Sequence, residues 1–451
     1  MKVLIVEVKP KNKKKCINKD LAGGMGTGTW IGDSLKARIF EYTKRKSVIL
    51  PNITNAYLVA IFKKHGWEVE YAEVDNINDF NKEVDLALVH TSIVDSSHEL
   101  EIVKKLKGKG LMVGVFGAFA SAVPEYFLKD VDFVIKGEAE SGVYNILNSG
   151  KFPKGIYEVD LVENINKLPF PDWSQFDIKK YSYFPALYKK PVLTMLTSRG
   201  CPYSCSYYCP YTLSAGKKWR NRNVENIVEE IEYLIKNYKI KAIDFRDAIF
   251  TLDKERALEL AEEIIRKKIK IIWSCETRLD RLDEDLINKM KEAGLRHLNV
   301  GIESYSEEVL KEQKRLPINL KHQENIIKYC HDNDVSIAAF YIIGLDSDTV
   351  ETVQSTINYA RKLNTMVAQF AISTPYPGTD YYKELKEQDR IKDFDWENFD
   401  EYTPIVKHKN LSDQKLLELK EQAFTSYYFG SSYIFKNYPK ILKNKLICLF
   451  S

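Results

Sequence analysis

Short apolar segments alternate with amphipathic segments through the first 150 residues of the chain. The pattern predicts strands at 3–8, 69–74, 85–91, 111–117 and 131–135, and helices near 55–64 and 99–106. Such βα alternation is typical of an open parallel sheet with helices on both faces. Any ligand of this sheet is expected at the carboxyl ends of its strands.

The pattern changes twice along the rest of the chain. Residues 151–190 carry four prolines and weak periodicity, which predicts an ordered connector and no core element. A second βα series occupies 191–385, with strands expected at 192–197, 240–245, 271–274, 298–302, 337–343 and 370–373. A Tyr-rich helical region fills 386–451. The sequence therefore predicts four segments, namely 1–150, 151–190, 191–385 and 386–451.

Composition places modest limits on function. The 451 residues are 44% hydrophobic and 29% charged, which is ordinary globular usage. The net charge of +4 is too small to argue for nucleic-acid binding, so no nucleic-acid partner is expected. The amino terminus lacks the apolar region and cleavage site of a signal peptide, and the seven cysteines suit a reducing compartment. A cytoplasmic location is therefore expected.

Three cysteines fall within nine residues and point to metal chemistry. Cys201, Cys205 and Cys209 directly follow the strand expected at 192–197 and a turn at 198–200. Thiolates are the ligands of iron–sulfur clusters, and three of them on a 4Fe-4S cluster leave one iron free for a small molecule. A zinc knuckle prefers four ligands and C-x2-C spacing, and a disulfide scaffold belongs to small secreted chains. A 4Fe-4S site is predicted here, with three ordinary thiols as the alternative.

This region resembles the radical S-adenosylmethionine (radical SAM) superfamily. Its signature is three cysteines after the first strand of a (β/α)6 partial TIM barrel, with an aromatic residue before the third cysteine, here Tyr208. The usual spacing is C-x3-C-x2-C, whereas this chain reads C-x3-C-x3-C. A loop has no strand register to keep, so it can accommodate one more residue.

The amino-terminal half resembles the cobalamin-binding domain that precedes the barrel in cobalamin-dependent radical SAM enzymes. Four segments carry the resemblance, at 88–92, 114–119, 136–140 and 168–173. The resemblance implies an α/β fold made of a Rossmann-like cobalamin-binding domain, a (β/α)6 partial TIM barrel and a helical C-terminal tail.

The same resemblance implies cofactor-binding residues in the amino-terminal half. The residues that it places near cobalamin are Thr91, Ser92, Gly117, Gly137 and Glu138. Gly117 and Gly137 end predicted strands, where a missing Cβ lets the backbone approach a flat ligand. Each glycine taken alone is better explained as a turn residue, and the case for cobalamin rests on their order ahead of the three-cysteine barrel.

Two further features bear on the corrin. Many cobalamin domains carry an Asp-x-His-x-x-Gly loop whose histidine ligates cobalt, but the first histidine here is His65, beyond the loop at 10–20. Cobalt is therefore expected without a protein imidazole, since His90 and His98 are poor substitutes. The glycine run at 23–28 lacks the Lys-Ser/Thr ending of a phosphate loop, and a loop that covers the sheet's carboxyl edge near corrin or substrate is expected.

Polar residues follow the predicted barrel strands, where barrel enzymes build their active sites. By the resemblance, Asp247, Glu303 or Ser304 would bind the ammonium or ribose hydroxyls of S-adenosylmethionine, with Glu276 and Arg278 as alternatives. Taken singly, each charge could be a solvated loop residue.

The resemblance implies a C-methyltransferase that forms a 5′-deoxyadenosyl radical, abstracts hydrogen from an unactivated carbon and uses methylcobalamin as methyl donor. A radical SAM cyclase or rearrangement enzyme, or a non-enzymatic metal-binding protein, remain as alternatives. An electron donor such as a flavodoxin or ferredoxin is implied. The substrate stays open among a small molecule, lipid, glycan or peptide. The C-terminal tail is expected to pack on the barrel, with peripheral membrane contact as the second reading.

Overall fold

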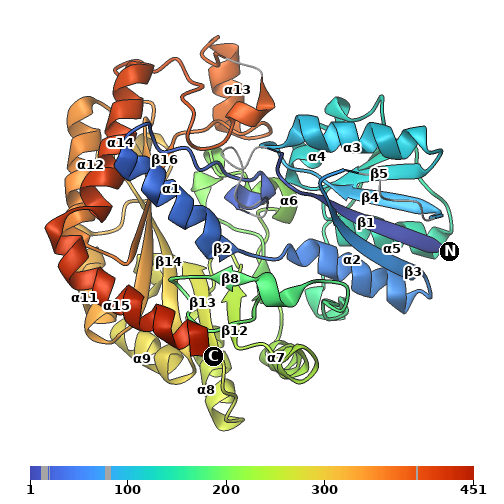
Figure 1. Cartoon of the computed structure of the whole chain (residues 1–451), viewed down its shortest axis with the longest axis horizontal. Helices are drawn as coiled ribbons and strands as arrows, with labels where there is room; N and C mark the ends of the chain where they lie inside the picture. The colour runs from blue at the N-terminus through green and yellow to red at the C-terminus, as the bar shows by residue number, and fades with distance from the viewer. Residues whose placement is uncertain (12–18, 20, 77–82, 393–394, 451) are drawn as a thin grey trace.

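Two six-stranded parallel sheets organise the chain in the computed structural model, one at each side of Figure 1. The structure describes residues 1–11, 19, 21–76, 83–392 and 395–450, and of 449–450 only the backbone. No helix within these ranges combines the length and apolar character needed to cross a membrane.

The first sheet has the strand order β3-β1-β4-β5-β6-β7, and all its pairs are parallel. Val3 and Ile5 of β1 pack into one apolar cluster, while Leu4 and Val6 pack into another on the opposite face. This period-2 alternation with both faces buried is what a helix-covered parallel sheet requires. The strands are β1 (Lys2–Val8), β3 (Glu68–Val74), β4 (Leu86–His90), β5 (Met112–Phe116), β6 (Phe133–Lys136) and β7 (Gly155–Glu158). The helices of this part are α2 (Ile53–Lys64), α3 (Ser96–Gly108), α4 (Ala118–Ala122) and α5 (Ala139–Ser149).

The second sheet is an open barrel with the order β16-β15-β14-β13-β12-β9, again parallel throughout. Its strands are β9 (Val192–Met195), β12 (Ala242–Phe245), β13 (Ile272–Thr277), β14 (Leu295–Glu303), β15 (Ser336–Ile343) and β16 (Val367–Ile372). Its helices are α7 (Val224–Tyr238), α8 (Lys254–Arg266), α9 (Glu284–Glu292), α10 (Glu307–Glu312), α11 (Leu320–Asp332) and α12 (Val350–Leu363). Each begins after an Asn, Asp, Ser or Thr side chain that accepts a backbone N–H of the first turn. This (β/α)6 arrangement confirms the predicted fold class.

The segment at 151–190 is more than a connector. Its strand β7 completes the first sheet beyond residue 150, and β8 (Ser182–Tyr183) pairs antiparallel with β2 (Val48–Ile49). Trp173 and Phe176 are buried in the main apolar cluster. The expectation that these residues contribute no core element is therefore wrong, because a four-residue edge strand among prolines carries too little periodicity to be recognised. The predicted division at residue 150 stays a prediction, although the sheet itself extends past it.

The C-terminal helices are α13 (Asp380–Glu387), α14 (Asp413–Tyr428) and α15 (Ser431–Phe450). Helix α14 and the start of α15 cover the edge of the barrel. Three tyrosine hydroxyls donate to backbone oxygens at or beside the edge strand β16: Tyr427 to Thr365, Tyr428 to Ala368 and Tyr433 to Met366. Covering an edge strand in this way prevents it from pairing with another chain. The tail thus packs on the barrel, as the favoured reading expected.

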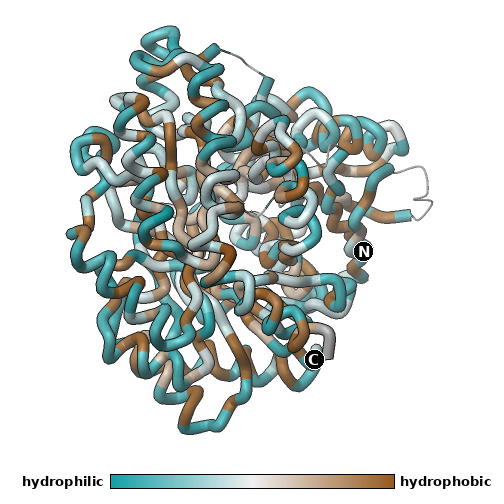
Figure 2. The backbone as a smooth tube through the Cα atoms, turned by 60° about the vertical axis from the view of Figure 1, so that its left-hand side comes forward, coloured by the Kyte–Doolittle hydropathy of each residue, from teal (hydrophilic) through white to brown (hydrophobic). Residues whose placement is uncertain are grey.

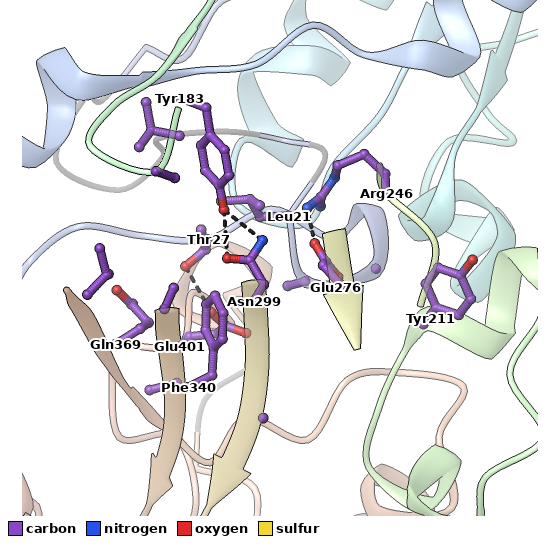
Figure 3. A pocket seen from close by; sticks show the side chains of 18 of the residues that line it. Leu21, Thr27, Tyr183, Tyr211, Arg246, Glu276, Asn299, Phe340, Gln369 and Glu401 are labelled. Atoms are coloured by element: carbon purple, nitrogen blue, oxygen red, sulfur yellow. Dashed lines mark hydrogen bonds and ion pairs between the residues drawn. The ribbon is translucent and has the colours of Figure 1, made fainter. Parts of the chain in front are cut away.

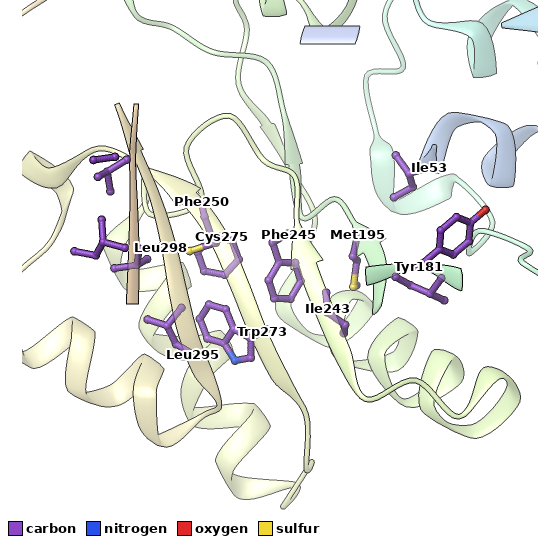
Figure 4. Packing of buried hydrophobic residues seen from close by; sticks show 14 of the residues in the cluster. Ile53, Tyr181, Met195, Ile243, Phe245, Phe250, Trp273, Cys275, Leu295 and Leu298 are labelled. Atoms are coloured by element: carbon purple, nitrogen blue, oxygen red, sulfur yellow. The ribbon is translucent and has the colours of Figure 1, made fainter. Parts of the chain in front are cut away.

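The barrel core is apolar and aromatic. Figure 4 shows Phe245, Phe250 and Trp273 packed together, with the rings of Phe245 and Trp273 edge to face at 5.5 Å between centroids. Cys275 lies among them, fully buried. Along the backbone in Figure 2, hydrophobic segments gather in the interior while hydrophilic turns lie outside. This core holds the strands whose carboxyl ends carry the polar residues described next.

Candidate functional site

One cavity of about 1190 Å³ is lined by both halves of the chain. Its wall includes the carboxyl ends of β4, β5 and β6 of the first sheet and those of β13 and β14 of the barrel. Helix α1 (Leu35–Ser47) and α15 close further sides. The two sheets therefore direct their carboxyl ends into a shared space, the place where parallel sheets bind ligands.

All three clustered cysteines line this cavity. Cys205 belongs to a short 3-10 helix, and its carbonyl accepts the N–H groups of Tyr208 at 3.1 Å and Cys209 at 3.0 Å. The longer second gap thus forms one helical turn, which keeps Cys205 and Cys209 on the same side of the loop. Burial raises the pKa of all three thiols, that of Cys209 to about 12. Metal binding would have to deprotonate them.

Within the described ranges, no three or more His, Cys, Asp and Glu side chains are grouped to hold a single metal ion. A cubane cluster presents its irons at separate corners, so its cysteine ligands stand further apart than the ligands of one ion. Three thiols on one cavity wall fit such a cluster.

Glu303, beside the cysteine loop, combines a strained backbone with an ion pair. It ends β14 with a left-handed φ of 67°, at an irregularity in the pairing with β15. Its carboxylate lies 3.1 Å from Arg315, which also donates to the Gly301 carbonyl. Burial raises the pKa of Glu303, and Arg315 and Arg278 oppose that shift. The pair lines the cavity together with Tyr208.

Two more predicted residues reach the cavity from β13 and the turn after it. Glu276 forms an ion pair with Arg246, and Arg278 pairs with Asp280 at 2.9 Å. The Arg278 guanidinium lies 4.5 Å from the ring centre of Tyr203, in the cysteine loop. These contacts fix the charged groups beside the cysteines before any ligand arrives.

Asp247 and Ser304 do not line the cavity. The Asp247 carboxylate accepts the Thr197 N–H at 2.7 Å and the hydroxyls of Thr197 and Ser198, both at 2.5 Å. Ser304 instead contacts Thr356 of α12. Asp247 therefore anchors the strand that leads into the cysteine loop, and a ligand contact by Asp247 or Ser304 stays a prediction.

In the first sheet, Gly117, Gly137 and Glu138 line the cavity, whereas Thr91 and Ser92 do not. The Thr91 hydroxyl donates to the Phe116 carbonyl, and Ser92 contacts Glu99. Both glycines have positive φ, 121° and 119°, and an added Cβ would lie 2.6 Å from the Thr91 oxygen and 2.8 Å from the Val159 oxygen. The glycines are therefore required by the neighbouring backbone itself, as well as by their place in the cavity wall.

A buried network of ion pairs joins the two halves at this wall. Glu138 lies 2.8 Å from Arg220 and 3.4 Å from Arg199, and Arg199 lies 2.6 Å from Glu140. Burial alone would raise the pKa of Glu138, but the two guanidinium groups lower it below its ordinary value. We call these four residues the interdomain clamp. Sequence reasoning found Glu138 but not its partners.

Of the three histidines considered as cobalt ligands, His90 alone lines the cavity. It ends β4 beside Gly117, and its ring lies 3.3 Å from the amide nitrogen of Asn52. Burial lowers its pKa to about 3, so the imidazole is neutral. His65 instead contacts the Ile61 carbonyl, and His98 is a buried residue of α3. The expected absence of a protein ligand to cobalt stays a prediction.

A further polar group lies away from the cysteines, and sequence reasoning missed it. Asn299, Phe340 and Gln369 extend from β14, β15 and β16 into the cavity (Figure 3). Tyr183 and Asn299 hydrogen bond at 2.9 Å, and the glycine-run residue Thr27 donates to Glu401 at 3.0 Å. Asn299 and Gln369 were visible as polar residues within apolar strands, whereas Glu401 gave no sequence signal.

The lysine of this group is Lys44 from α1. It donates to Gln369 at 3.0 Å and contacts the Tyr402 hydroxyl. Burial lowers the pKa of Lys44 to about 7 and raises that of Glu401 to about 7. Leu21, Gly23 and Gly24 also line the cavity, so the glycine run lies in its wall. This end therefore offers hydrogen-bonding groups that can change charge near neutral pH.

The comparison with protein families agrees with this geometry. The model of the radical SAM superfamily matches residues 195–360. An uncharacterized methyltransferase of Pyrococcus horikoshii is 28% identical over 369 residues, covering 77% of this chain and 79% of that protein. The anaerobic magnesium-protoporphyrin IX monomethyl ester cyclase of Rubrivivax gelatinosus is 26% identical over 379 residues, covering 77% of this chain and 65% of the cyclase.

Two solved structures share the fold over most of the chain. The radical S-adenosylmethionine methyltransferase TsrM from Kitasatospora setae, with cobalamin and a 4Fe-4S cluster bound, matches with a TM-score of 0.62 and 17% identity, covering 86% of this chain and 78% of TsrM. The cobalamin-dependent S-adenosylmethionine radical enzyme OxsB, with aqua-cobalamin and S-adenosylmethionine bound, matches with a TM-score of 0.68 and 14% identity, covering 99% of this chain and 72% of OxsB. The chain therefore contains a radical SAM domain at residues 195–360, and as a whole it has the two-sheet fold of these two cobalamin-dependent structures.

Proposed function

We propose that this protein is a cobalamin-dependent radical SAM methyltransferase that methylates an unactivated carbon. The observation that carries the proposal is the shared cavity, because it brings the three cysteines, the charged strand ends of the barrel and the carboxyl edge of the first sheet together. A methyl donor and a hydrogen-abstracting radical must both reach one substrate carbon. A single cavity with both cofactor regions on its wall meets that requirement.

The residues divide into three groups. Cys201, Cys205 and Cys209 would hold the 4Fe-4S cluster. Glu303 and Arg278 would bind the ammonium and carboxylate of S-adenosylmethionine, since they present opposite charges beside the cysteines. Gly117, Gly137, Glu138 and His90 would form the wall against the corrin.

When bound, these cofactors supply a 5′-deoxyadenosyl radical and a transferable methyl group. The protein contributes orientation and exclusion of water. Arg246 holds Glu276, and Arg315 holds Glu303, so the polar wall is fixed by ion pairs. The group formed by Lys44, Gln369, Tyr183 and Asn299 would bind the polar part of the substrate. Phe340 and the apolar strand positions around it would shield the reacting carbon from solvent.

The proposal is tested by the ratio of products under anaerobic, reducing conditions. Each methyl transfer consumes two molecules of S-adenosylmethionine and two electrons from a flavodoxin- or ferredoxin-like donor. We expect one 5′-deoxyadenosine, one methionine and one S-adenosylhomocysteine for each methylated product, with the abstracted hydrogen in the deoxyadenosine. Reconstituted protein is incubated with candidate substrates and methyl-labelled S-adenosylmethionine, and the products are quantified by mass spectrometry.

Deoxyadenosine without stoichiometric S-adenosylhomocysteine would contradict methyl transfer and favour a cyclase or rearrangement. That second function is supported by the cyclase relative. Absence of iron and corrin after reconstitution would contradict both.

A further inference from the structure

Helices α1 and α15 lie beside the outer opening of the cavity. Ile39 and Tyr42 of α1, and Tyr438 and Leu442 of α15, line the cavity and are exposed to solvent as well. Residues that line the cavity and are also exposed to solvent mark where the cavity opens. Figure 1 shows both helices in front of the barrel strands. A substrate that enters here therefore passes between two helices with apolar side chains.

The same helices expose further apolar residues outside the opening. Leu35 of α1 is 74% exposed and Phe435 of α15 is 81% exposed, and Leu446 continues the row. Along α15 the exposed apolar positions recur every three or four residues, as on one face of a helix. Exposed apolar residues gathered on two helices at the opening of a cavity mark an interaction surface. We call it the α1–α15 face, defined by Leu35, Ile39, Tyr42, Ile434, Phe435, Tyr438, Leu442 and Leu446.

The charges on these two helices have one sign. Neither helix has an exposed acidic residue: α15 contains no Asp or Glu, and Glu41 of α1 is buried, where it accepts the Ile31 N–H. The exposed basic residues of the two helices are Lys36, Arg38, Lys46, Lys436, Lys443 and Lys445. Exposed Asp33 precedes α1, and Asp334 pairs with Lys440 of α15, so the border of the face is mainly but not wholly basic. An apolar face with a mainly basic border is complementary to an anionic lipid surface, and helices of this composition lie in the interface plane.

We propose that the α1–α15 face docks on an anionic lipid bilayer and that an amphiphilic substrate enters the cavity from the bilayer. The assignment of the substrate rests on the proposed function, whereas the docking surface does not. Docking would bury Leu35, Phe435 and Leu446 in the interface and would align the opening with the apolar layer. The substrate class is then an amphiphile, with its apolar part toward α15 and its polar group toward Lys44 and Gln369.

The experiment measures partitioning of the full-length, reconstituted protein onto vesicles by flotation. Vesicles of phosphatidylcholine with phosphatidylglycerol are compared with vesicles of phosphatidylcholine alone, at low and high salt. We expect binding to the anionic vesicles at low salt, and at least tenfold weaker partitioning on neutral vesicles or in high salt. Each lysine near an anionic surface contributes about a fivefold factor to partitioning.

Two surface variants test the assignment to these helices. Phe435→Ser with Leu446→Ser removes exposed apolar area, and Lys36→Glu with Lys443→Glu reverses two charges. Each double variant should lower partitioning at least tenfold. The matched control is Lys64→Glu with Lys129→Glu, which makes the same charge change at exposed positions of the first-sheet half and should leave partitioning unchanged.

Equal binding to neutral and anionic vesicles, equal loss in the control variant, or no vesicle binding would each overturn the proposal. A concentration-dependent dimer that is abolished by the face variants, without vesicle binding, would assign the face to a second copy of this chain. Iron and corrin are quantified in the same samples. Vesicle binding by protein that lacks both cofactors would refute the proposed function and leave the docking surface standing.

Discussion

Cys201, Cys205 and Cys209 lie together in one loop. Their environment differs from that of the other thiols of the barrel. Cys275 is fully buried among aromatic rings, and burial raises its pKa. The three loop cysteines instead line the cavity beside Arg278 and Arg315. Residue type alone therefore does not distinguish a candidate ligand from a packing residue, but access to a cavity with charged groups beside the thiol does.

Replacing any one of the three loop cysteines by Ala should abolish the cluster, because each is expected to ligate one iron. Iron and acid-labile sulfide should fall from about four per chain to near zero after anaerobic reconstitution. Cys275→Ala should keep the full iron content and lose only packing contacts in the barrel core. Full iron in all three loop variants, or equal loss in Cys275→Ala, would contradict the assignment.

At the scale of the element, the edge strand β16 depends on tyrosines from α14. The Tyr428 hydroxyl accepts the Ala368 N–H and donates to the Ala368 carbonyl, both at 2.9 Å. One side chain thus satisfies both backbone groups of a buried residue. Helix α14 therefore contributes part of the hydrogen bonding that a seventh strand would otherwise supply.

Tyr428→Phe should lower the free energy of unfolding by about 1 to 3 kcal/mol, because it leaves two buried backbone groups unpaired. The change is measured as a lower thermal midpoint and as faster amide hydrogen exchange at Ala368. The matched control is Tyr438→Phe, because the Tyr438 side chain is half exposed. This control should change neither the thermal midpoint nor the exchange at Ala368. Unchanged exchange in Tyr428→Phe would show that α14 does not hold this strand.

At the scale of the whole molecule, the cavity exists because two sheets are held at a fixed distance. The interdomain clamp connects β6 and α5 of the first half to β10 (Ser198–Arg199) and β11 (Arg220–Asn221), which flank the cysteine loop. A rotation of one half against the other would separate the cysteines from the wall that we propose binds the corrin. The clamp is thus a positioning device for both cofactor regions.

Breaking an ion pair of the interdomain clamp should lower the free energy of unfolding. Glu138→Gln leaves Arg220 and Arg199 buried with less compensation, and loss of one partner in a buried pair costs about 3 to 5 kcal/mol. We expect Glu138→Gln to lower the stability and the affinity for cobalamin while iron content is retained. Arg220→Met combined with Glu138→Gln should cost less than the sum of the two single changes, measured by denaturant unfolding and corrin titration. Strict additivity would contradict direct coupling.

The sequence by itself determined the two βα series and predicted the cysteine site. Period-2 apolar strands and capped amphipathic helices are local features, so β1, β4, β15 and their neighbours were predicted close to their observed bounds. The cysteine spacing and Tyr208 are also local. For the same reason Glu276, Arg278 and Glu303, which end strands of one parallel sheet, were correctly expected on a common edge.

Only the tertiary structure decided what lies opposite that edge. Asp247 and Ser304 also follow strand ends, yet their side chains point to Thr197 and Thr356. The position of a residue at a strand end does not fix the direction of its side chain, because that direction depends on the rotamer and on the neighbouring packing. Lys44 and Glu401 are more than 350 residues apart and reach one cavity through α1 and the C-terminal region. Such long-range contacts have no local pattern in the sequence, since they depend on how complete elements pack.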